Sequence, residues 1–456
     1  MEQTTQHSAF FQGTFNKPVT CTFDVEAASS DGGGLLLGAL DRMLGLIKRL
    51  AAKLQDKRDP GRVEHTYLEI LRQRVFSIAL GYPDCNDASR LANDPVLKML
   101  CDRDAVKGPS LASQPTLSRF ENSPSARELI EMGRALEDFV IQRHRKRLGP
   151  YVRLVTIDLD PSDDPTHGQQ TFSFFNGHYG GWCYLPIFGF ISFNNEPEQY
   201  LFYARLRPGN SRAPRNAIPT LRRIVKKIRE SFPYARIRVR LDGGFASPLV
   251  FQILEELDLE YIVAIGSNKR LRDLSESWIQ EAREKSIESG KAEQIFGEFS
   301  YATMSWPHQR RIILKAEVVH LPGHPSRDNI RFVVTNLNHK PENIYKIYRK
   351  RGEIENRIKE LHYGLGIDRT SCPRFLANQL RVIETATAYI LFQELRLRAK
   401  RTEVRRAQVR TLREKLLKIG VRVVESVRRV VLHFPITHPW QGLWIKIARK
   451  VGAIAT

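Results

Sequence analysis

Apolar residues recur every three or four positions in the first third of the chain. Leu36 and Leu40 show this spacing, which is typical of the buried face of a helix. The same spacing returns over 64–80 and again, over a longer stretch, at 125–147. Turn-forming residues separate these runs. The pattern therefore predicts a helical domain over 35–150.

The pattern changes at residue 151 to segments rich in β-branched and aromatic residues, which favour strands. After a first strand-like segment, three segments between residues 171 and 207 are expected to form antiparallel strands with glycine turns, and two helix–strand pairs follow them. This order makes 151–266 a mixed α/β core. The strand-like segments are 152–160, 171–177, 180–193, 199–207, 236–245 and 260–266, with helices over 217–231 and 248–257.

The remaining segments complete the predicted organisation. Strand-like runs make 267–340 a β-rich insertion, and 341–395 returns to helical spacing. Residues 1–34 alternate apolar and polar positions before the stretch SSDGGG, which predicts a strand and a linker. Residues 396–456 are predicted to be a basic, helical C-terminal region.

The net charge says more about the partner of this protein than its length does. The chain has 456 residues, with 71 Lys and Arg against 50 Asp and Glu, which gives a formal net charge of +21. Self-repulsion at this charge disfavours a compact state, and a polyanion relieves it. Nucleic acid is the commonest such partner. Residues 396–430 alone carry 13 Lys and Arg, so this segment is expected to bind DNA or to pair with a second subunit, and DNA is favoured.

Composition excludes several other classes of protein. The hydrophobic share of 42% and the charged share of 27% are ordinary globular values, which excludes a mostly disordered chain. The five Cys are scattered without a CxxC pair, so neither a disulfide framework nor a Cys-built zinc site is expected. No apolar run approaches the roughly 20 residues that span a bilayer, and the N-terminus lacks a signal-peptide pattern. We expect a cytoplasmic protein.

Acidic residues end two of the predicted strands. Asp158 and Asp160 lie in the stretch TIDLDPSDD, and strand alternation puts both on one face. Asp242 ends the alternating strand RVRLD and precedes two glycines, which allow close approach of a substrate. A single strand-end Asp is more often a turn former or helix cap. Several together in a basic chain favour a site for phosphate chemistry.

A third acid lies on a predicted helix. Tyr348, Arg351 and Glu355 recur at helical spacing in IYRKRGEIENRIKELHYG. Two strand carboxylates and one helix carboxylate together can hold two Mg²⁺ ions, because Mg²⁺ prefers oxygen ligands. Two such ions clamp the attacking and leaving oxygens of a phosphoryl displacement. The Tyr and Arg are then placed to bind a phosphate.

In the order Asp160, Asp242, Glu355, the chain resembles the DDE transposases of bacterial insertion sequences, in the group 1 DDE branch. Tyr348 and Arg351 match the family's Tyr-x2-Arg-x3-Glu-x6-Lys signature. The stretches ALGYPDCNDASRLANDP, FFNGHYGGWCYLP and LDGGF also resemble that branch. The resemblance covers about residues 35–395.

The resemblance implies an RNase-H-like catalytic core, split into 151–266 and 341–395 by the insertion. It implies that Asp160, Asp242 and Glu355 hold two Mg²⁺ ions, for which Mn²⁺ would substitute. The implied reaction is cut-and-paste: strand cleavage at terminal inverted repeats, then strand transfer into target DNA. Double-stranded DNA and a second copy of the chain are the implied partners, in the bacterial cytoplasm at the nucleoid.

Two positions depart from the family pattern. The signature Lys position holds His362, so either this His or Lys359, one turn earlier, takes the phosphate-binding role. The first acid has an alternative in Asp158, although Asp160 ends the strand and is followed by x-Ser, as in the family. Both choices stay open at the level of sequence.

Further roles follow from the resemblance. Related transposases stack a Trp of the insertion on a flipped base, and Trp278 and Trp306 are the candidates, although core packing is the more common role for each. The helical domain is expected to bind the inverted repeats, through residues such as Arg72 and Arg74. The competing functions are a DNA-binding descendant without activity and a metal-dependent nuclease that cuts but does not join.

Overall fold

The computed structural model describes residues 8–13, 16–214, 217–320 and 325–454. The chain forms two compact units. Unit 2 holds all three predicted catalytic acids. Unit 1 comprises Met1–Ile47, Asp56–Phe120 and Leu391–Thr456, and unit 2 comprises Lys48–Gln55 and Glu121–Ile390.

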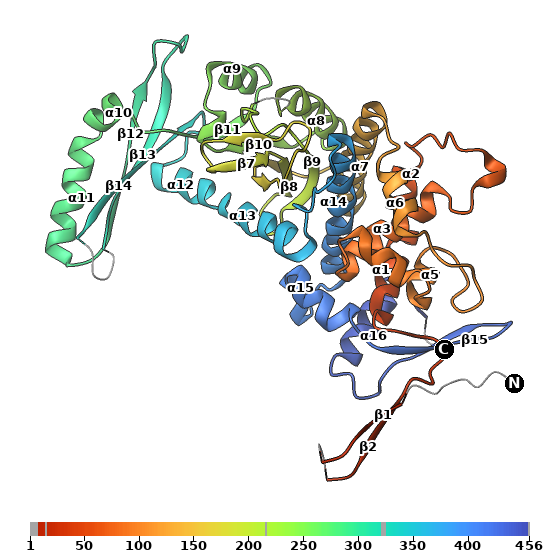
Figure 1. The fold of residues 1–456 in the computed structure, drawn as a ribbon. Helices are drawn as coiled ribbons and strands as arrows, with labels where there is room; N and C mark the ends of the chain where they lie inside the picture. The colour runs from red at the N-terminus through yellow and green to blue at the C-terminus, as the bar shows by residue number, and fades with distance from the viewer. Residues whose placement is uncertain (1–7, 14–15, 215–216, 321–324, 455–456) are drawn as a thin grey trace, which may run out of the picture. The chain divides into compact units, whose positions relative to one another are not determined.

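An eight-stranded mixed sheet forms the centre of unit 2, in the order β12-β13-β14-β11-β10-β4-β8-β9 (Figure 1). Strands β4, β10 and β11 run parallel, and the other neighbouring pairs are antiparallel. The predicted mixed α/β architecture is thereby confirmed. The strands are β4 (Leu154–Pro161), β8 (Ile187–Phe193), β9 (Tyr200–Arg205), β10 (Arg236–Leu241), β11 (Glu260–Ile265), β12 (Glu293–Tyr301), β13 (Arg310–Val319) and β14 (Arg327–Thr335).

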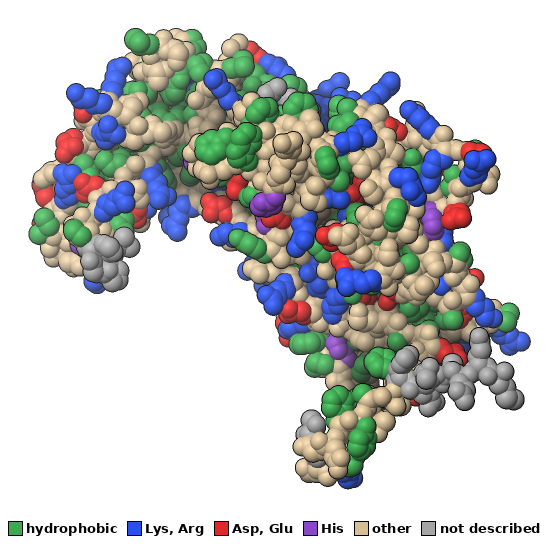
Figure 2. Space-filling view, viewed as in Figure 1, with side chains coloured by type: hydrophobic (Ala, Val, Ile, Leu, Met, Phe, Trp, Pro, Cys, Tyr) green, Lys and Arg blue, Asp and Glu red, His purple; other side chains and the backbone are tan. Residues whose placement is uncertain are grey.

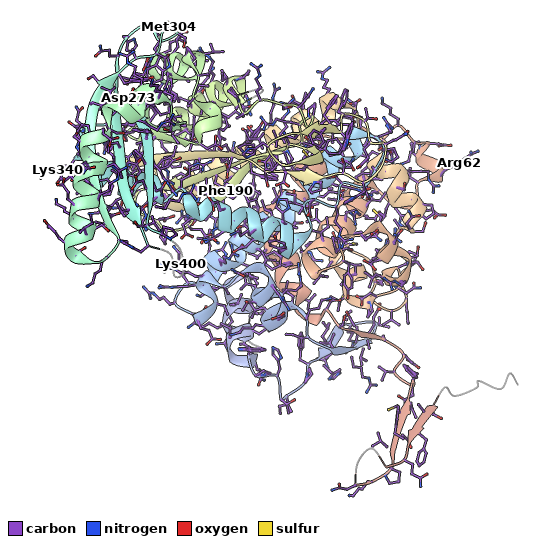
Figure 3. The ribbon with its side chains drawn as sticks, turned by 60° about the vertical axis from the view of Figure 1, so that its left-hand side comes forward. Arg62, Phe190, Asp273, Met304, Lys340 and Lys400 are labelled. Atoms are coloured by element: carbon purple, nitrogen blue, oxygen red, sulfur yellow. The ribbon has the colours of Figure 1, made fainter. Side chains whose placement is uncertain are left out.

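The centre of this sheet is buried on both faces, which explains the continuous apolar runs in its sequence. Every residue of β8 is buried, and Phe190 lies within the sheet (Figure 3). Position 189 has no room for a side chain, because a Cβ on Gly189 would lie 2.9 Å from the Tyr203 Cβ. Long amphipathic helices pack on the sheet and on each other, as α7 does on β9 and α8. The helices here are α7 (Ala126–Leu148), α8 (Ala217–Ser231) and α9 (Pro248–Glu256).

The segment predicted as a β-rich insertion extends the sheet beyond β11 rather than forming a sheet of its own. Its strands share one core with the helix that follows, built from Ile262, Ile313, Val333 and Ile344. Met304 lies in the loop between β12 and β13, fully exposed (Figure 3). The insertion's helices are α10 (Lys269–Leu274) and α11 (Glu276–Ser289).

A helical segment runs from the insertion back toward the central strands (Figure 1). Its α-helical pattern is interrupted at two places, first between α12 and α13 and then at a π-helical turn. The following helix, α14, is long and largely buried. These elements are α12 (Pro341–Arg349), α13 (Gly352–Lys359), η5 (Glu360–Gly364) and α14 (Phe375–Arg398).

One part of the strand prediction was wrong. The run over 180–193 is not one strand but two, because the chain turns at Leu185–Pro186 and Pro cannot continue the ladder. The first half joins 174–176 and a two-residue strand in a separate sheet, of order β5-β7-β6. Its strands are β5 (Asp164–Pro165), β6 (Phe174–Asn176) and β7 (Gly181–Tyr184).

Unit 1 contains most of the predicted N-terminal helices, together with the C-terminal residues of the chain. Helix α3 begins with a capping box, in which Thr66 and Glu69 bond each other's backbone N–H. The helices α2 and α6, like α14, have residues in both units. The helices of this region are α1 (Leu35–Leu44), α2 (Leu46–Ala51), α3 (Tyr67–Leu80), α4 (Ala88–Leu91), α5 (Pro95–Leu100), α6 (Gln114–Glu121), α15 (Val409–Leu412) and α16 (Gln441–Lys450).

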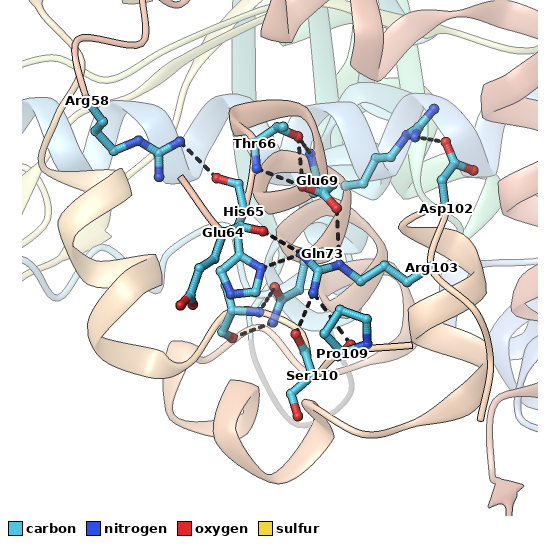
Figure 4. A network of polar contacts seen from close by, with 12 residues as sticks. Arg58, Glu64, His65, Thr66, Glu69, Gln73, Asp102, Arg103, Pro109 and Ser110 are labelled. Atoms are coloured by element: carbon cyan, nitrogen blue, oxygen red, sulfur yellow. Dashed lines mark hydrogen bonds and ion pairs between the residues drawn. The ribbon is translucent and has the colours of Figure 1, made fainter. Parts of the chain in front are cut away.

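Arginine side chains tie the loops of unit 1 to its helices (Figure 4). The Arg103 guanidinium bonds Glu69 at 3.1 Å and donates to the Ser110 carbonyl at 2.7 Å. Arg72 pairs with Asp41 and Asp102. Arg72 and Arg74 are both buried, so the prediction that these two arginines contact DNA was wrong.

The C-terminal region is not wholly helical, contrary to its prediction. Strand β15 (Val421–Glu425) pairs on one side with β16 (Val430–His433) and on the other with β3 (Ala28–Ser29). Both C-terminal strands are rich in valine, which favours strands even among many Lys and Arg. The N-terminal stretch forms a separate exposed hairpin, β1 (Ser8–Phe11) with β2 (Val19–Thr22). Within the described ranges, the structure contains no helix with the length and apolar character that spanning a membrane requires.

Candidate active site

The parallel strands β4 and β10 bring two acids to the same edge of the sheet. Their register pairs Arg240 with Asp158, so continuing it by two residues sets Asp242 beside Asp160. Side chains at the carboxyl ends of parallel strands face the crevice where ligands of α/β sheets bind. The two predicted acids therefore lie together in unit 2.

One arginine bridges this acid pair. Arg351, at the start of α13, bonds the Asp160 Oδ1 at 2.6 Å and lies 3.5 Å from the Asp242 Oδ2. Burial raises the pKa of Asp160 to about 7, against the opposing effect of Arg351, and the charge of Asp242 raises it further. Two neighbouring carboxylates disfavour each other's charged form, so positive charge beside them stabilises the ionised pair.

Local structure fixes the second acid. Asp242 caps the short helix η4 (Gly243–Phe245) and accepts a hydrogen bond from the Gly244 N–H at 2.9 Å. A Cβ on Gly244 would lie 3.2 Å from the Ala213 Cβ, so a small residue suits this position. One oxygen of Asp242 is held by the backbone, and the other faces Arg351.

Asp158, the alternative first acid, has different surroundings. It is fully buried, and both its oxygens bond Arg240, at 2.7 and 2.6 Å. Arg240 also donates to the Ile347 carbonyl at 2.7 Å, which ties β10 to α12. Asp158 is therefore committed to a buried ion pair that holds the helix on the sheet.

The helix residues of the predicted site divide into two groups. Tyr348 reaches the acid-bearing edge, with its hydroxyl 3.5 Å from the Leu241 carbonyl, and burial raises its pKa. Glu355 and Lys359 are exposed on α13. Among the residues that the structure describes, no three His, Cys, Asp or Glu side chains gather as a metal site. Glu355 is thus not brought to the acid pair.

His362, at the position of the signature Lys, lies close to the first acid's loop. Its Nε2 is 3.2 Å from the hydroxyl of Ser162, two residues after Asp160. Its Nδ1 is 3.3 Å from the Asp368 carboxylate, which pairs with the ring when it is protonated. A protonated His362 carries the positive charge that phosphate binding requires.

The two candidate Trp side chains both pack within unit 2. The Trp306 ring contacts Phe251 at a centroid distance of 5.1 Å, and Arg310 lies over its face. Trp278 covers Gly297 of β12 so closely that a Cβ there would lie 2.4 Å from the ring. Base stacking by either Trp stays a prediction.

Sequence reasoning missed Arg240 and Tyr179, and it used Ser162 only as part of the x-Ser pattern after Asp160. Arg240 carries the ion pair with Asp158, and Ser162 contacts His362. Tyr179, in the turn between β6 and β7, lies within electrostatic reach of the acids, because burial and the charges of Asp163, Asp160 and Asp242 raise its pKa to about 12. A signal existed for Arg240 only, since arginine at alternate positions of a buried strand requires an acidic partner.

The donor set at the sheet edge suits a divalent cation. Mg²⁺ is commonly held by one or two protein carboxylates, with waters and substrate phosphates completing its shell. Asp160 and Asp242 supply two carboxylates beside each other, and the Arg351 guanidinium pairs with both. These two residues would hold the ion.

Comparison with protein families gives one match that spans nearly the whole chain. The family model for the transposase DDE domain, group 1, matches residues 11–455. A comparison with curated proteins gives no match.

Proposed function

Because the chain belongs to group 1 of the DDE transposases, we propose that unit 2 contains an RNase-H-like core that cuts and joins DNA. Strand order supports this core. Numbered along the chain, β4, β8, β9, β10 and β11 lie in the order 3-2-1-4-5, with the second strand antiparallel to the first. The acids lie at the end of the first strand and after the fourth.

The observation that carries the proposal is the Asp160–Arg351–Asp242 cluster. Asp160 and Asp242 would hold Mg²⁺ or Mn²⁺, with Glu355 as a third ligand once α13 brings it closer. When bound, the ions supply charge stabilisation on the phosphate and activate water. A carboxyl group binds a metal ion in its ionised form. Because burial raises the pKa of Asp160 to about 7, this side chain must lose its proton before it can bind the ion.

The proposed reaction has two phosphoryl transfers. Water attacks a phosphodiester at the inverted repeat and loses a proton as its bond to phosphorus forms, while the P–O3′ bond breaks and the leaving 3′ oxygen takes a proton. The freed 3′-OH then attacks a target phosphodiester and loses its proton as the new P–O bond forms, while the target's P–O3′ bond breaks and the target's 3′ oxygen takes a proton. Arg351 orients the acids and pairs with phosphate, and Tyr348 and His362 are placed to bind the same strand.

Double-stranded DNA is the proposed partner, with the helical domain over 35–150 contacting the inverted repeats. Because Arg72 and Arg74 are buried, those contacts come from other side chains. A dimer is proposed because two ends must be joined in one event.

The test is strand cleavage and joining of DNA ends taken from the element that encodes the chain, with Mg²⁺ or Mn²⁺. Asp160→Asn, Asp242→Asn and Glu355→Gln should each abolish both steps. Glu353→Gln is the matched control, because Glu353 is an exposed acid on the same helix. Cleavage without joining would indicate a nuclease, and binding without either step would indicate an inactive descendant.

A further inference from the structure

A small sheet beside the acid pair exposes several aromatic side chains. Strand β5 begins four residues after Asp160, and β7 pairs with it, so the β6–β7 hairpin is attached to the loop that leaves the first acid. In Figure 2 a group of apolar side chains is visible where Figure 1 places β7. The exposed aromatics of this segment are Phe172, Phe174, Phe175, Tyr179 and Trp182.

Two of these side chains form a pair on one face. Phe175 and Trp182 lie directly opposite each other in the antiparallel ladder, so their side chains are neighbours. They are 58% and 60% exposed, which is unusual for two adjacent large rings. On the other face of the hairpin, Cys183 is buried.

The hairpin is held in place from several sides. The Asn176 amide donates to the Gly209 carbonyl at 2.8 Å, and the Thr166 N–H donates to the Trp182 carbonyl at 3.0 Å. The Phe172 ring contacts Phe375 edge-on at 5.4 Å. The exposed pair is therefore presented on a fixed support rather than on a loose loop.

Its position suits a strand of DNA. Thr166, whose backbone bonds Trp182, is six residues from Asp160, so at most about 20 Å of chain separates them. Bases in a stacked strand are about 3.4 Å apart, so this reach corresponds to roughly six nucleotides. Burial and the charges of Asp163, Asp160 and Asp242 raise the pKa of Tyr179 in the turn, which agrees with a hairpin close to the acids.

Charge and open space near the hairpin favour the same ligand. Arg212 is exposed in the loop whose Gly209 carbonyl accepts the hydrogen bond from Asn176 of the hairpin. Added Cβ atoms at Gly177 and Gly181 would meet nothing within 4 Å, so a ligand can approach the turn. Proteins that bind single-stranded nucleic acid combine aromatic rings, on which the bases stack, with positively charged side chains along the backbone path.

We propose that Phe175 and Trp182 stack on unpaired bases of the DNA strand next to the phosphate that is cut. This inference rests on the proposed function and assigns the base-binding role to the β6–β7 hairpin. Stacking of this kind tolerates any base sequence, because every base has an aromatic face.

The test measures binding of the whole chain, without metal, to a DNA fork that carries 2-aminopurine in its unpaired arm. The wild type should bind the fork and quench the 2-aminopurine fluorescence. Trp182→Ala and Phe175→Ala should each weaken fork binding by roughly 5- to 150-fold and remove the quenching, as removal of one stacked base does. Binding of a fully paired duplex should not change.

The chain offers a matched control. Tyr151 and Tyr234 are also an exposed, stacked aromatic pair, but they precede β4 and β10 and so lie at the opposite edge of the sheet. Replacing both with Ala should leave fork binding unchanged. If the alanine variants of the hairpin fail to fold, Trp182→Phe and Trp182→Leu replace them, and only the Phe variant should keep quenching.

Three outcomes would overturn the inference. Fork binding could be equal in Trp182→Leu and wild type, or it could be abolished equally in the Tyr151/Tyr234 control. The hairpin variants could instead change only the sedimentation coefficient, which would indicate a contact between copies. The binding assay involves no cutting, so the two proposals can fail separately. If the wild type quenches the fork but never cuts DNA, only the proposed function is contradicted. If the wild type cuts DNA but the hairpin variants bind and quench the fork as it does, only this inference is contradicted.

Discussion

Asp160 and Asp158 are two residues apart on one strand, yet their surroundings separate their roles. Asp158 is fully buried and bonded by both oxygens to Arg240. Asp160 is partly exposed at the edge of the sheet and shares Arg351 with Asp242. This difference supports Asp160 as the first acid, a choice that the strand pattern alone left open.

Buried Asp158 and Arg240 lead to a stability prediction. Arg240→Met should lower the free energy of unfolding by about 3–5 kcal/mol, because it leaves the Asp158 charge buried without its partner. Chemical denaturation measures the change. The double variant Asp158→Leu with Arg240→Met should recover most of the stability, since no charge then stays buried. A single variant as stable as the wild type would contradict this account.

Asp164 predicts a dependence of stability on pH. Burial, with the nearby charges of Asp368 and Asp163, raises its pKa to about 8, although Thr370 donates a hydrogen bond to it. Between the ordinary value of 3.8 and about 8, the folded chain keeps a proton that the unfolded chain releases. The free energy of unfolding should therefore fall as pH rises, by up to about 1.4 kcal/mol per pH unit.

Asp164→Asn tests this dependence, because asparagine stays neutral. The stability of the wild type relative to the variant should decline across this range and level off above about pH 8. Thermal unfolding at a series of pH values gives the comparison. Parallel curves for the two proteins would show that Asp164 is not the responsible group.

Residue-scale prediction from the sequence worked where the chemistry is local. The stretches TIDLD and LDGG predicted acidic residues at strand ends, and in the structure Asp160 and Asp242 lie side by side. The sequence could not show that Arg351 lies between them, because that contact depends on how α13 packs on β4. It also could not show that Glu355 stays exposed.

At the scale of elements, packing of the insertion depends on one glycine. Trp278 of α11 lies against Gly297 of β12, where a Cβ would be 2.4 Å from the ring. Gly297→Ala should cost about 1–3 kcal/mol of stability through overpacking. Gly266→Ala is the control, because a Cβ there meets nothing within 4 Å. Equal unfolding midpoints for both variants in denaturant would contradict this packing.

Regular elements were predicted well where periodicity was strong. The predicted helix over 217–231 coincides with α8, and strands β10 and β11 lie within their predicted ranges. The prediction failed where a single residue interrupts a strand, or where many charged residues surround the apolar residues of a strand. Pro186 divides one apolar run between two sheets, and the valines of β15 and β16 form strands among many basic residues. Sheet membership, moreover, is a long-range property that no local pattern reports.

At the scale of the whole molecule, the net charge of +21 is spread widely. Lys and Arg side chains lie over the visible surface rather than in one patch (Figure 2). DNA binding should therefore be dominated by phosphate contacts, and it should weaken steeply with salt. For 6–10 phosphate contacts, affinity should fall by about 10³–10⁵ between 50 and 200 mM salt.

The C-terminal region offers a specific test of this charge. Arg405 and Arg406 are exposed. Replacing both with Gln should flatten the slope of log affinity against log salt by about 0.9 for each phosphate that these arginines neutralise. Fluorescence anisotropy with a labelled duplex measures the slope. An unchanged slope would exclude this segment from the DNA interface.

The central claim is that Asp160 and Asp242 form the metal-dependent centre of a transposase. Anomalous diffraction from crystals grown with Mn²⁺ and a DNA end tests it most directly. We predict a manganese peak within coordination distance of both carboxylates, with Glu355 drawn toward it and Arg351 displaced from between the acids. A peak elsewhere, or none at Asp160 and Asp242 while DNA is bound, would contradict the claim.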